Sequence, residues 1–231
     1  MAVTIKKESF MSVQTVRNMT IHIPSALRLV GILGGTWAIL ITVGMVIAYL
    51  PDHPDFSPLT TYLSDMSDTP GWSQIIWNSG TLIAVPIRYL VLVLLVMRLQ
   101  QLGAGKAFAI ATLIIGFFST AGTALMTATP FSVSPVVHKT GIGLYFFGVV
   151  VLQTIIFIKE WSLKSIPRGL PLLSLAMVIV YFVFVTLVVL LEQGVVSRAT
   201  PVIWEWLAFF TSIAWVLAQS ILLGRTDRVQ S

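Results

Sequence analysis

Apolar residues dominate six long stretches of the chain, and polar residues gather in the shorter segments between them. The stretches cover about 27–50, 74–97, 107–127, 138–158, 170–191 and 202–223. An α-helix needs about 20 mainly apolar residues to cross a hydrocarbon core about 30 Å thick. Lipid offers the backbone no hydrogen-bonding partner, so each stretch must satisfy its own peptide groups, as a helix does. The pattern predicts an all-α, polytopic membrane protein, a bundle of six transmembrane helices.

The polar segments divide the chain into three regions. We expect an N-terminal segment over 1–26, a transmembrane domain over 27–223 and a short tail over 224–231. The first region is polar and mixed, which does not fit a cleavable signal peptide. The loop 51–73 contains four Asp and four Pro, and we expect it to form an ordered cap over one end of the bundle.

Composition supports the membrane assignment and narrows the function. Hydrophobic residues make up 56% of the chain and charged residues 10%, against about 25% charged in a typical soluble domain. The net charge is +5, but the basic residues lie at span ends and form no continuous face, so we expect no nucleic-acid partner. There is no cysteine, which excludes disulfides and thiolate metal sites.

The distribution of Lys and Arg predicts the orientation in the membrane. Cytoplasmic loops of membrane proteins carry an excess of both residues. One side of the predicted bundle has eleven of the fourteen basic residues, and the other has two, Lys139 and Arg198. Both termini are therefore expected to be cytoplasmic. The eleven are Lys6, Lys7, Arg17, Arg28, Arg98, Lys106, Lys159, Lys164, Arg168, Arg225 and Arg228.

Arg88 is the basic residue that falls inside a span. It lies about fourteen residues into the second stretch, roughly 21 Å at 1.5 Å per residue, and two residues after Pro86. An ionisable group at membrane depth is costly and is a candidate functional site. One interpretation is that Arg88 extends toward the headgroups. The other is that it is a buried cation that holds a lipid phosphate or a carboxylate.

A second candidate site combines polar residues at the outer ends of the spans. Glu205 begins the sixth span, His138 begins the fourth and Asn78 begins the second, while Asp65 and Asp68 belong to the cap. Because the helix starts share one depth, we expect Glu205 and His138 to be in contact directly or through one water. An acid in a first helical turn also gains from the helix dipole, so these residues could serve structure alone.

Sequence motifs give little support for an enzyme. The chain contains no HExxH, GxSxG, Walker A or dinucleotide glycine pattern. His138 is the one histidine expected in a span, whereas a catalytic zinc commonly takes three protein ligands. We therefore expect no metal and no cofactor, and we lean away from catalysis.

Short motifs resemble those of the Frag/DRAM/Sfk family of six-span membrane proteins. Residues 62–70 read Tyr-Leu-Ser-Asp-Met-Ser-Asp-Thr-Pro, similar to the family's ISD-x-G-x-x-P stretch after the first span. Val137–Gly141 at the fourth span and the Glu205–Trp206 pair at the sixth also match. Ser67 stands where the family usually has Gly. A related prokaryotic domain of unknown function has a similar layout.

The resemblance implies a role with lipids. Eukaryotic members are linked to lipid remodelling, phospholipid asymmetry, sterol handling and autophagy, and no catalytic residue can be carried over. It also implies that Asp65, Asp68, His138 and Glu205 form a shared outer site. We therefore expect a membrane protein that binds or senses lipid through this cluster. The alternatives are an accessory subunit that packs against a larger membrane complex and a small proton-coupled transporter.

Overall fold

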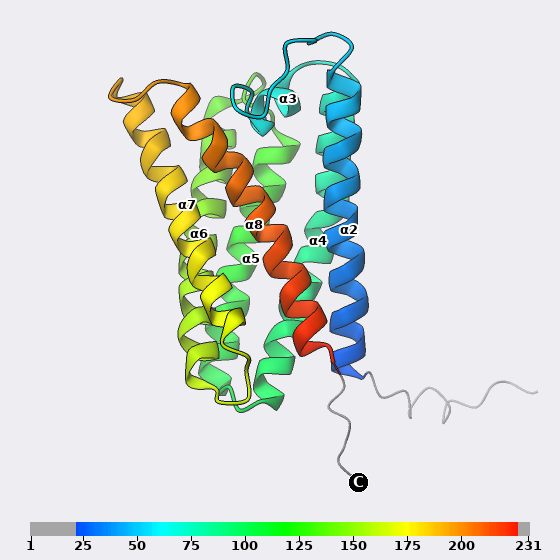
Figure 1. The fold of residues 1–231 in the computed structure, drawn as a ribbon, viewed down its shortest axis with the longest axis vertical. Helices are drawn as coiled ribbons and strands as arrows, with labels where there is room; N and C mark the ends of the chain where they lie inside the picture. Colours follow the sequence, from blue (N-terminus) through cyan, green and yellow to red (C-terminus); the bar gives the residue numbers. More distant parts are fainter. Residues whose placement is uncertain (1–21, 226–231) are drawn as a thin grey trace, which may run out of the picture.

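The computed structural model describes residues 22–225, and within that range the chain is helical with no strand. Six helices are long and apolar enough to cross a membrane, which confirms the six predicted spans. The seventh is a short helix in the cap. The helices are α2 (Ile23–Tyr49), α3 (Leu63–Asp68), α4 (Trp72–Gln101), α5 (Lys106–Ala128), α6 (Pro135–Ser162), α7 (Gly169–Glu192) and α8 (Ala199–Leu223) (Figure 1).

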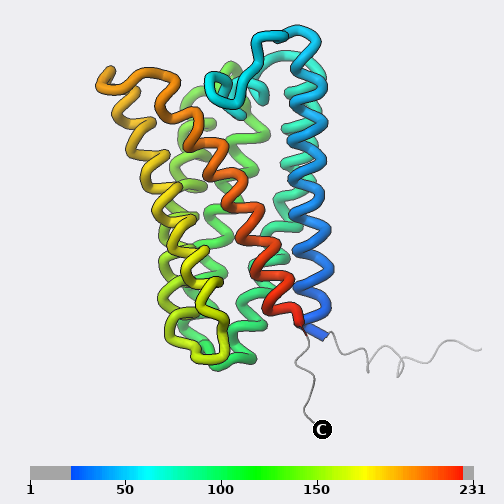
Figure 2. The backbone as a smooth tube through the Cα atoms, viewed as in Figure 1, coloured from blue at the N-terminus to red at the C-terminus, as the bar shows by residue number. Residues whose placement is uncertain are grey.

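The six long helices form a closed ring in chain order. Each packs against the next, and α8 closes the ring on α2. Figure 2 shows that α8 runs obliquely across the bundle, beside α7 at the cap end and beside α2 at the other. At that second end Gly224 lies against Pro24 and Arg28, so both ends of the described chain lie on the same side of the membrane domain.

Glycines set the closest helix contact, between α5 and α6. A Cβ added to Gly122 would lie 2.6 Å from the Tyr145 amide nitrogen, and one on Gly141 would lie 2.6 Å from that of Met126. Real Cβ atoms do not approach backbone so closely, so these positions require small residues, as is common between membrane helices. The contact fixes Tyr145 beside α5, where its ring lies 5.4 Å from the Arg88 guanidinium.

The loop between α2 and α4, called the cap here, contains the short helix α3. Leu63 and Met66 of α3 are buried together with Tyr62, and they pack on side chains from α2, α7 and α8. Asp65 accepts a hydrogen bond from the Tyr62 amide at 3.2 Å and thereby caps the helix start. The apolar contacts and this cap hold α3 against the ends of the long helices.

The long helices extend beyond the apolar stretches that predicted them. The second predicted span ends at 97, whereas α4 continues to Gln101, and α6 runs from Pro135 to Ser162 around a predicted 138–158. Polar residues beyond the hydrocarbon core remain helical because their backbone amides continue the hydrogen bonds of the preceding helical turn. Pro86 lies within α4, which continues on both sides of it. Lys6, Lys7, Arg17 and Arg228 fall outside the described residues.

Candidate functional site

Glu205 connects the start of α8 to the start of α3. Its carboxylate accepts a hydrogen bond from the Leu63 amide at 2.5 Å. Beside it, the Tyr62 hydroxyl donates to the Arg198 carbonyl at 2.9 Å and the Trp206 indole donates to the Thr61 carbonyl at 3.0 Å. Glu205 therefore satisfies an amide at the first turn of α3, where a helix has no internal acceptor.

Asp65 joins this junction through Arg198. The two side chains form an ion pair at 2.5 Å, and the Arg198 guanidinium lies 4.9 Å from the centre of the Tyr62 ring. The hydrogen bond from Arg198 to Asp65 raises the pKa of the guanidinium. Burial raises the pKa of Tyr62 to about 12, so its hydroxyl keeps its proton and remains a donor. Asp65 and Glu205 thus belong to one cluster that fastens the cap.

Asp68 and His138 lie in different contacts. Asp68 accepts from the Ser132 hydroxyl at 2.9 Å and so joins α3 to the turn between α5 and α6. The His138 Nδ1 atom lies 2.9 Å from the Met126 carbonyl and 3.0 Å from that of Thr129, at the end of α5. The ring closes this turn by donating to both carbonyls.

The outer residues therefore take part in separate contacts. His138 and Glu205 have different protein partners, and within the described residues no hydrogen bond joins the two side chains; their contact through one water stays a prediction. Asn78 is half-buried in α4, and its side chain makes no hydrogen bond to any residue between 22 and 225. The structure gives four of the five outer residues protein partners and leaves Asn78 without one in the described range.

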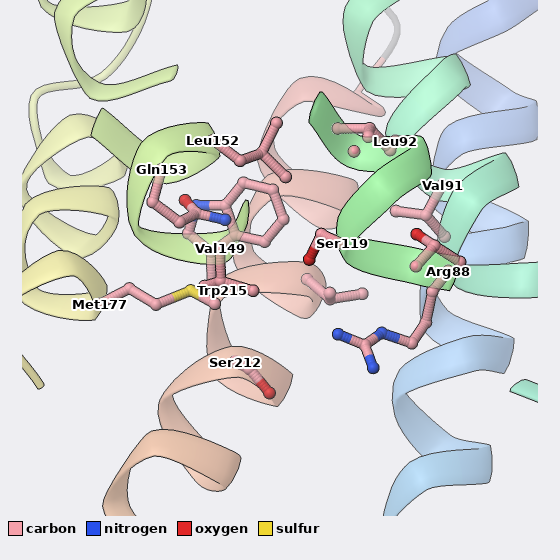
Figure 3. Close-up of a pocket in the computed structure, with 13 residues that line it drawn as sticks. Arg88, Val91, Leu92, Ser119, Val149, Leu152, Gln153, Met177, Ser212 and Trp215 are labelled. Carbon is pink, nitrogen blue, oxygen red and sulfur yellow. The ribbon is translucent and has the colours of Figure 1, made fainter. Parts of the chain in front are cut away.

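Arg88 lies in a cavity of about 80 Å³ between five helices (Figure 3). Its guanidinium is 5.4 Å from the centre of the Tyr145 ring, at the distance of a cation–π contact. Over the described part of the chain, no carboxylate forms an ion pair with it. The lining residues come from α4 (Arg88, Val91, Leu92), α5 (Gly116, Ser119, Thr120), α6 (Val149, Leu152, Gln153), α7 (Met177) and α8 (Ser212, Trp215, Val216).

Polar groups from three helices face the same cavity as Arg88. Figure 3 shows the guanidinium extending from α4 into the space between Ser119 and Ser212. The Gln153 side chain is 2% exposed, and its Oε1 atom has no hydrogen-bond partner among the described residues. The cavity therefore combines a cation that has no acid partner in this range with an unsatisfied buried amide.

A buried carboxyl, Glu160, lies toward the opposite end of the bundle from the cap. It is 0% exposed and accepts from the Ser174 hydroxyl at 3.0 Å and from the Gln219 amide at 2.6 Å. The Trp215 indole, which borders the cavity, donates to Ser174 at 2.9 Å. Sequence reasoning missed Glu160 and Gln153. The signal was their spacing of seven residues, which puts two polar groups on one face of a helix that continues past the predicted span.

The comparisons with known proteins concern the whole membrane domain. A family model described as the Frag1/DRAM/Sfk1/Cwh43P N-terminal domain matches residues 26–223, from α2 to the end of α8. The comparisons with curated proteins and with solved structures gave no match. Between residues 22 and 225, no three His, Asp or Glu side chains are grouped as metal ligands would be.

Proposed function

The chain belongs to the Frag1/DRAM/Sfk1/Cwh43P family, and from that premise we propose that it is a lipid-binding protein that acts without catalysis. It is an integral, multi-pass membrane protein. The observation that carries the proposal is Arg88, a cation in a cavity at membrane depth with no acid partner among the described residues. The proposed ligand is a membrane lipid whose anionic group enters the cavity.

Energetic reasons favour an anion at Arg88. An unpaired guanidinium in an apolar environment costs several kcal/mol, and a cation–π contact offsets about 2 kcal/mol when desolvated. The contact with Tyr145 therefore leaves part of that cost uncompensated. The planar guanidinium fork fits a phosphate or a carboxylate by two hydrogen bonds. Its position over a ring of α6 supports the buried-cation interpretation over extension toward the headgroups.

The size of the cavity limits which part of a lipid can enter. One water needs about 10–15 Å³ of cavity volume, so this cavity of about 80 Å³ holds roughly six waters or one small polar group. Acyl chains do not fit and must leave between helices toward the bilayer. The ligand group is thus a phosphate or a carboxylate, with its chains outside the cavity.

We assign a different role to the outer cluster. Glu205 accepts from the first amide of α3, and Asp65 pairs with Arg198. Asp68 and His138 form hydrogen bonds with the end of α5 and the turn that follows it. Their hydrogen-bonding groups are directed at protein. We propose that these residues hold the cap closed over the bundle, and that lipid is bound at Arg88 instead.

We also propose that both termini face the cytoplasm. Seven of the described basic residues lie at or near the end of the bundle away from the cap, and two lie on the cap side. That excess follows the charge rule for cytoplasmic loops. A reporter fused after Ser231 is expected to report the cytoplasm, and activity of a periplasmic or luminal reporter at that site would contradict the orientation.

The lipid proposal is tested by the lipid that remains bound after purification in a mild detergent. Native mass spectrometry should show a bound anionic lipid on the wild-type protein. Arg88→Leu should remove it, and Arg88→Lys should retain a smaller amount, because Lys keeps the charge and loses the two-point contact. Lys164→Leu is the matched control, since it removes an exposed cation at the end of the bundle.

Two outcomes would contradict this function. Equal lipid retention by Arg88→Leu and the wild-type protein would remove the cavity as the lipid site. A stoichiometric protein partner, together with unchanged lipid in Arg88→Leu, would favour the accessory subunit.

A further inference from the structure

Glu160 is a buried carboxyl that does not line the proposed lipid site. It lies near the end of α6 and has neutral partners, Ser174 from α7 and Gln219 from α8. Gln219 is itself 0% exposed, and its Oε1 atom has no partner in the part of the chain that the structure describes. An unused acceptor therefore lies on the side chain that contacts the carboxyl.

Three basic groups near this end of the bundle have partners other than Glu160. The Lys159 amine lies 5.9 Å from the centre of the Phe108 ring of α5. Arg168, before α7, donates to the Trp161 carbonyl at 2.6 Å, and Arg98 of α4 donates to the Leu223 carbonyl at 3.0 Å. No ion pair reaches Glu160 from any residue between 22 and 225. A buried charge without a counter-ion is costly, and a proton removes that charge.

We propose that Glu160 is a proton-binding site buried inside the helix bundle, and that its proton is taken up together with the anion at Arg88. This inference rests on the proposed lipid site. The structural link is Trp215, which borders the cavity and donates to Ser174, the donor to Glu160. Gln153 of the cavity wall precedes Glu160 by seven residues, about 10 Å along the helix.

Charge explains why the two ligands bind together. With the cavity empty, Arg88 is positive and favours an ionised Glu160. An anion bound at Arg88 offsets that positive charge, so the carboxyl binds its proton more tightly. At separations of about 10–20 Å and an effective dielectric of about 20, the effect is several-fold. Linkage requires the reverse as well, so a proton on Glu160 strengthens anion binding. Anion affinity therefore rises as pH falls.

The test uses phosphatidylglycerol with a fluorescent acyl chain, in maltoside micelles with the full chain. Its phosphodiester does not titrate near neutrality, so a pH effect belongs to the protein. Fluorescence anisotropy from about pH 8 to about pH 5 should show affinity increasing several-fold for the wild-type protein. Glu160→Gln, a neutral mimic of the protonated side chain, should bind with the tight affinity at every pH. Asp55→Asn is the control, and it should behave like the wild type.

A second measurement makes the proton site testable without lipid binding. Infrared spectra at about pH 5 should show a component of the protonated-carboxyl absorption that Glu160→Gln removes and Asp55→Asn keeps. A wild-type affinity that does not change with pH, with phosphatidylglycerol still bound, would overturn the joint uptake and leave the lipid site standing. Absence of phosphatidylglycerol binding at any pH would overturn the lipid site and, with it, the joint uptake. Absence of the Glu160 infrared component would overturn the proton site and the joint uptake, and leave the lipid site standing.

Discussion

Two regions place charged side chains at the ends of or between apolar helices: the cap junction, formed by Tyr62, Asp65, Arg198 and Glu205, and the Arg88 cavity. They differ in what those side chains contact. At the junction, Glu205 has a backbone amide and Asp65 has Arg198. In the cavity, Arg88 has an aromatic ring and no carboxylate in the described range, and the Gln153 Oε1 atom there is unsatisfied. The first arrangement is complete without a ligand, and the second is not.

This difference separates stability from binding. Removing one member of the junction leaves its buried partner without a hydrogen bond, which lowers the free energy of unfolding. Removing a member of an unsatisfied cavity relieves a cost and takes away a contact for the ligand. Variants of the cap junction should therefore change stability with lipid retained, and variants of the cavity should change lipid with stability retained.

The largest expected loss of stability comes from Glu205→Leu. The substitution leaves the buried Leu63 amide without its acceptor, so we expect a loss of about 1–3 kcal/mol in unfolding free energy. Thermal unfolding in detergent measures it, with Asp52→Asn as an exposed control that should cost little. Lipid lost at unchanged stability would instead move the lipid site to the cap.

Alkaline pH should weaken the junction through Tyr62. Its pKa is raised from 10.0 to about 12 by burial, so the folded state keeps a proton that the unfolded state has released. The stabilising contribution is complete below pH 10 and declines as pH rises from 10 toward about 12. Thermal unfolding of Tyr62→Phe should show a smaller decline over this range than the wild type. A parallel decline in both proteins would place its origin elsewhere.

A smaller effect, of opposite sign, is expected in the cavity. Gln153→Leu replaces a buried amide whose oxygen is unsatisfied with an apolar group of similar size, which should raise stability in detergent by up to about 1 kcal/mol. The same variant should retain less anionic lipid. A loss of stability with lipid unchanged would mean that the amide already has its partner within the protein.

The smallest effect should come from Asp65→Asn. The Asp65 and Arg198 side chains are 30% and 60% exposed, and pairs of this kind contribute about 0–1 kcal/mol. The loss should also shrink as salt is added, because exposed charges are screened. A loss as large as that of Glu205→Leu, unaffected by salt, would show that the ion pair is a main support of the cap.

The sequence predicted the six membrane-spanning helices. A run of about 20 apolar residues has one stable form in lipid, so the six helices followed from hydropathy alone. The helix ends were less predictable, because polar residues at the membrane surface continue a helix as readily as they end it.

Neighbours around the ring could not be predicted from depth. His138 and Glu205 begin their helices on the same side of the membrane, but α6 packs on α5 and α7, whereas α8 packs on α7 and α2. The contact of Arg88 with Tyr145 joins helices that are not consecutive in the chain. Gln153 and Glu160 were missed because a single polar residue in an apolar run can face lipid, a neighbouring helix or a cavity.

The location of the bound lipid tests the central claim most directly. An anionic phospholipid with a photoreactive diazirine beside its phosphate can be bound, irradiated and mapped by peptide mass spectrometry. The account predicts adducts on the cavity residues from α4, α5 and α8, including Ser119 and Ser212, and their loss in Arg88→Leu. Adducts concentrated on the cap around Tyr62 and Arg198, unchanged in Arg88→Leu, would contradict it.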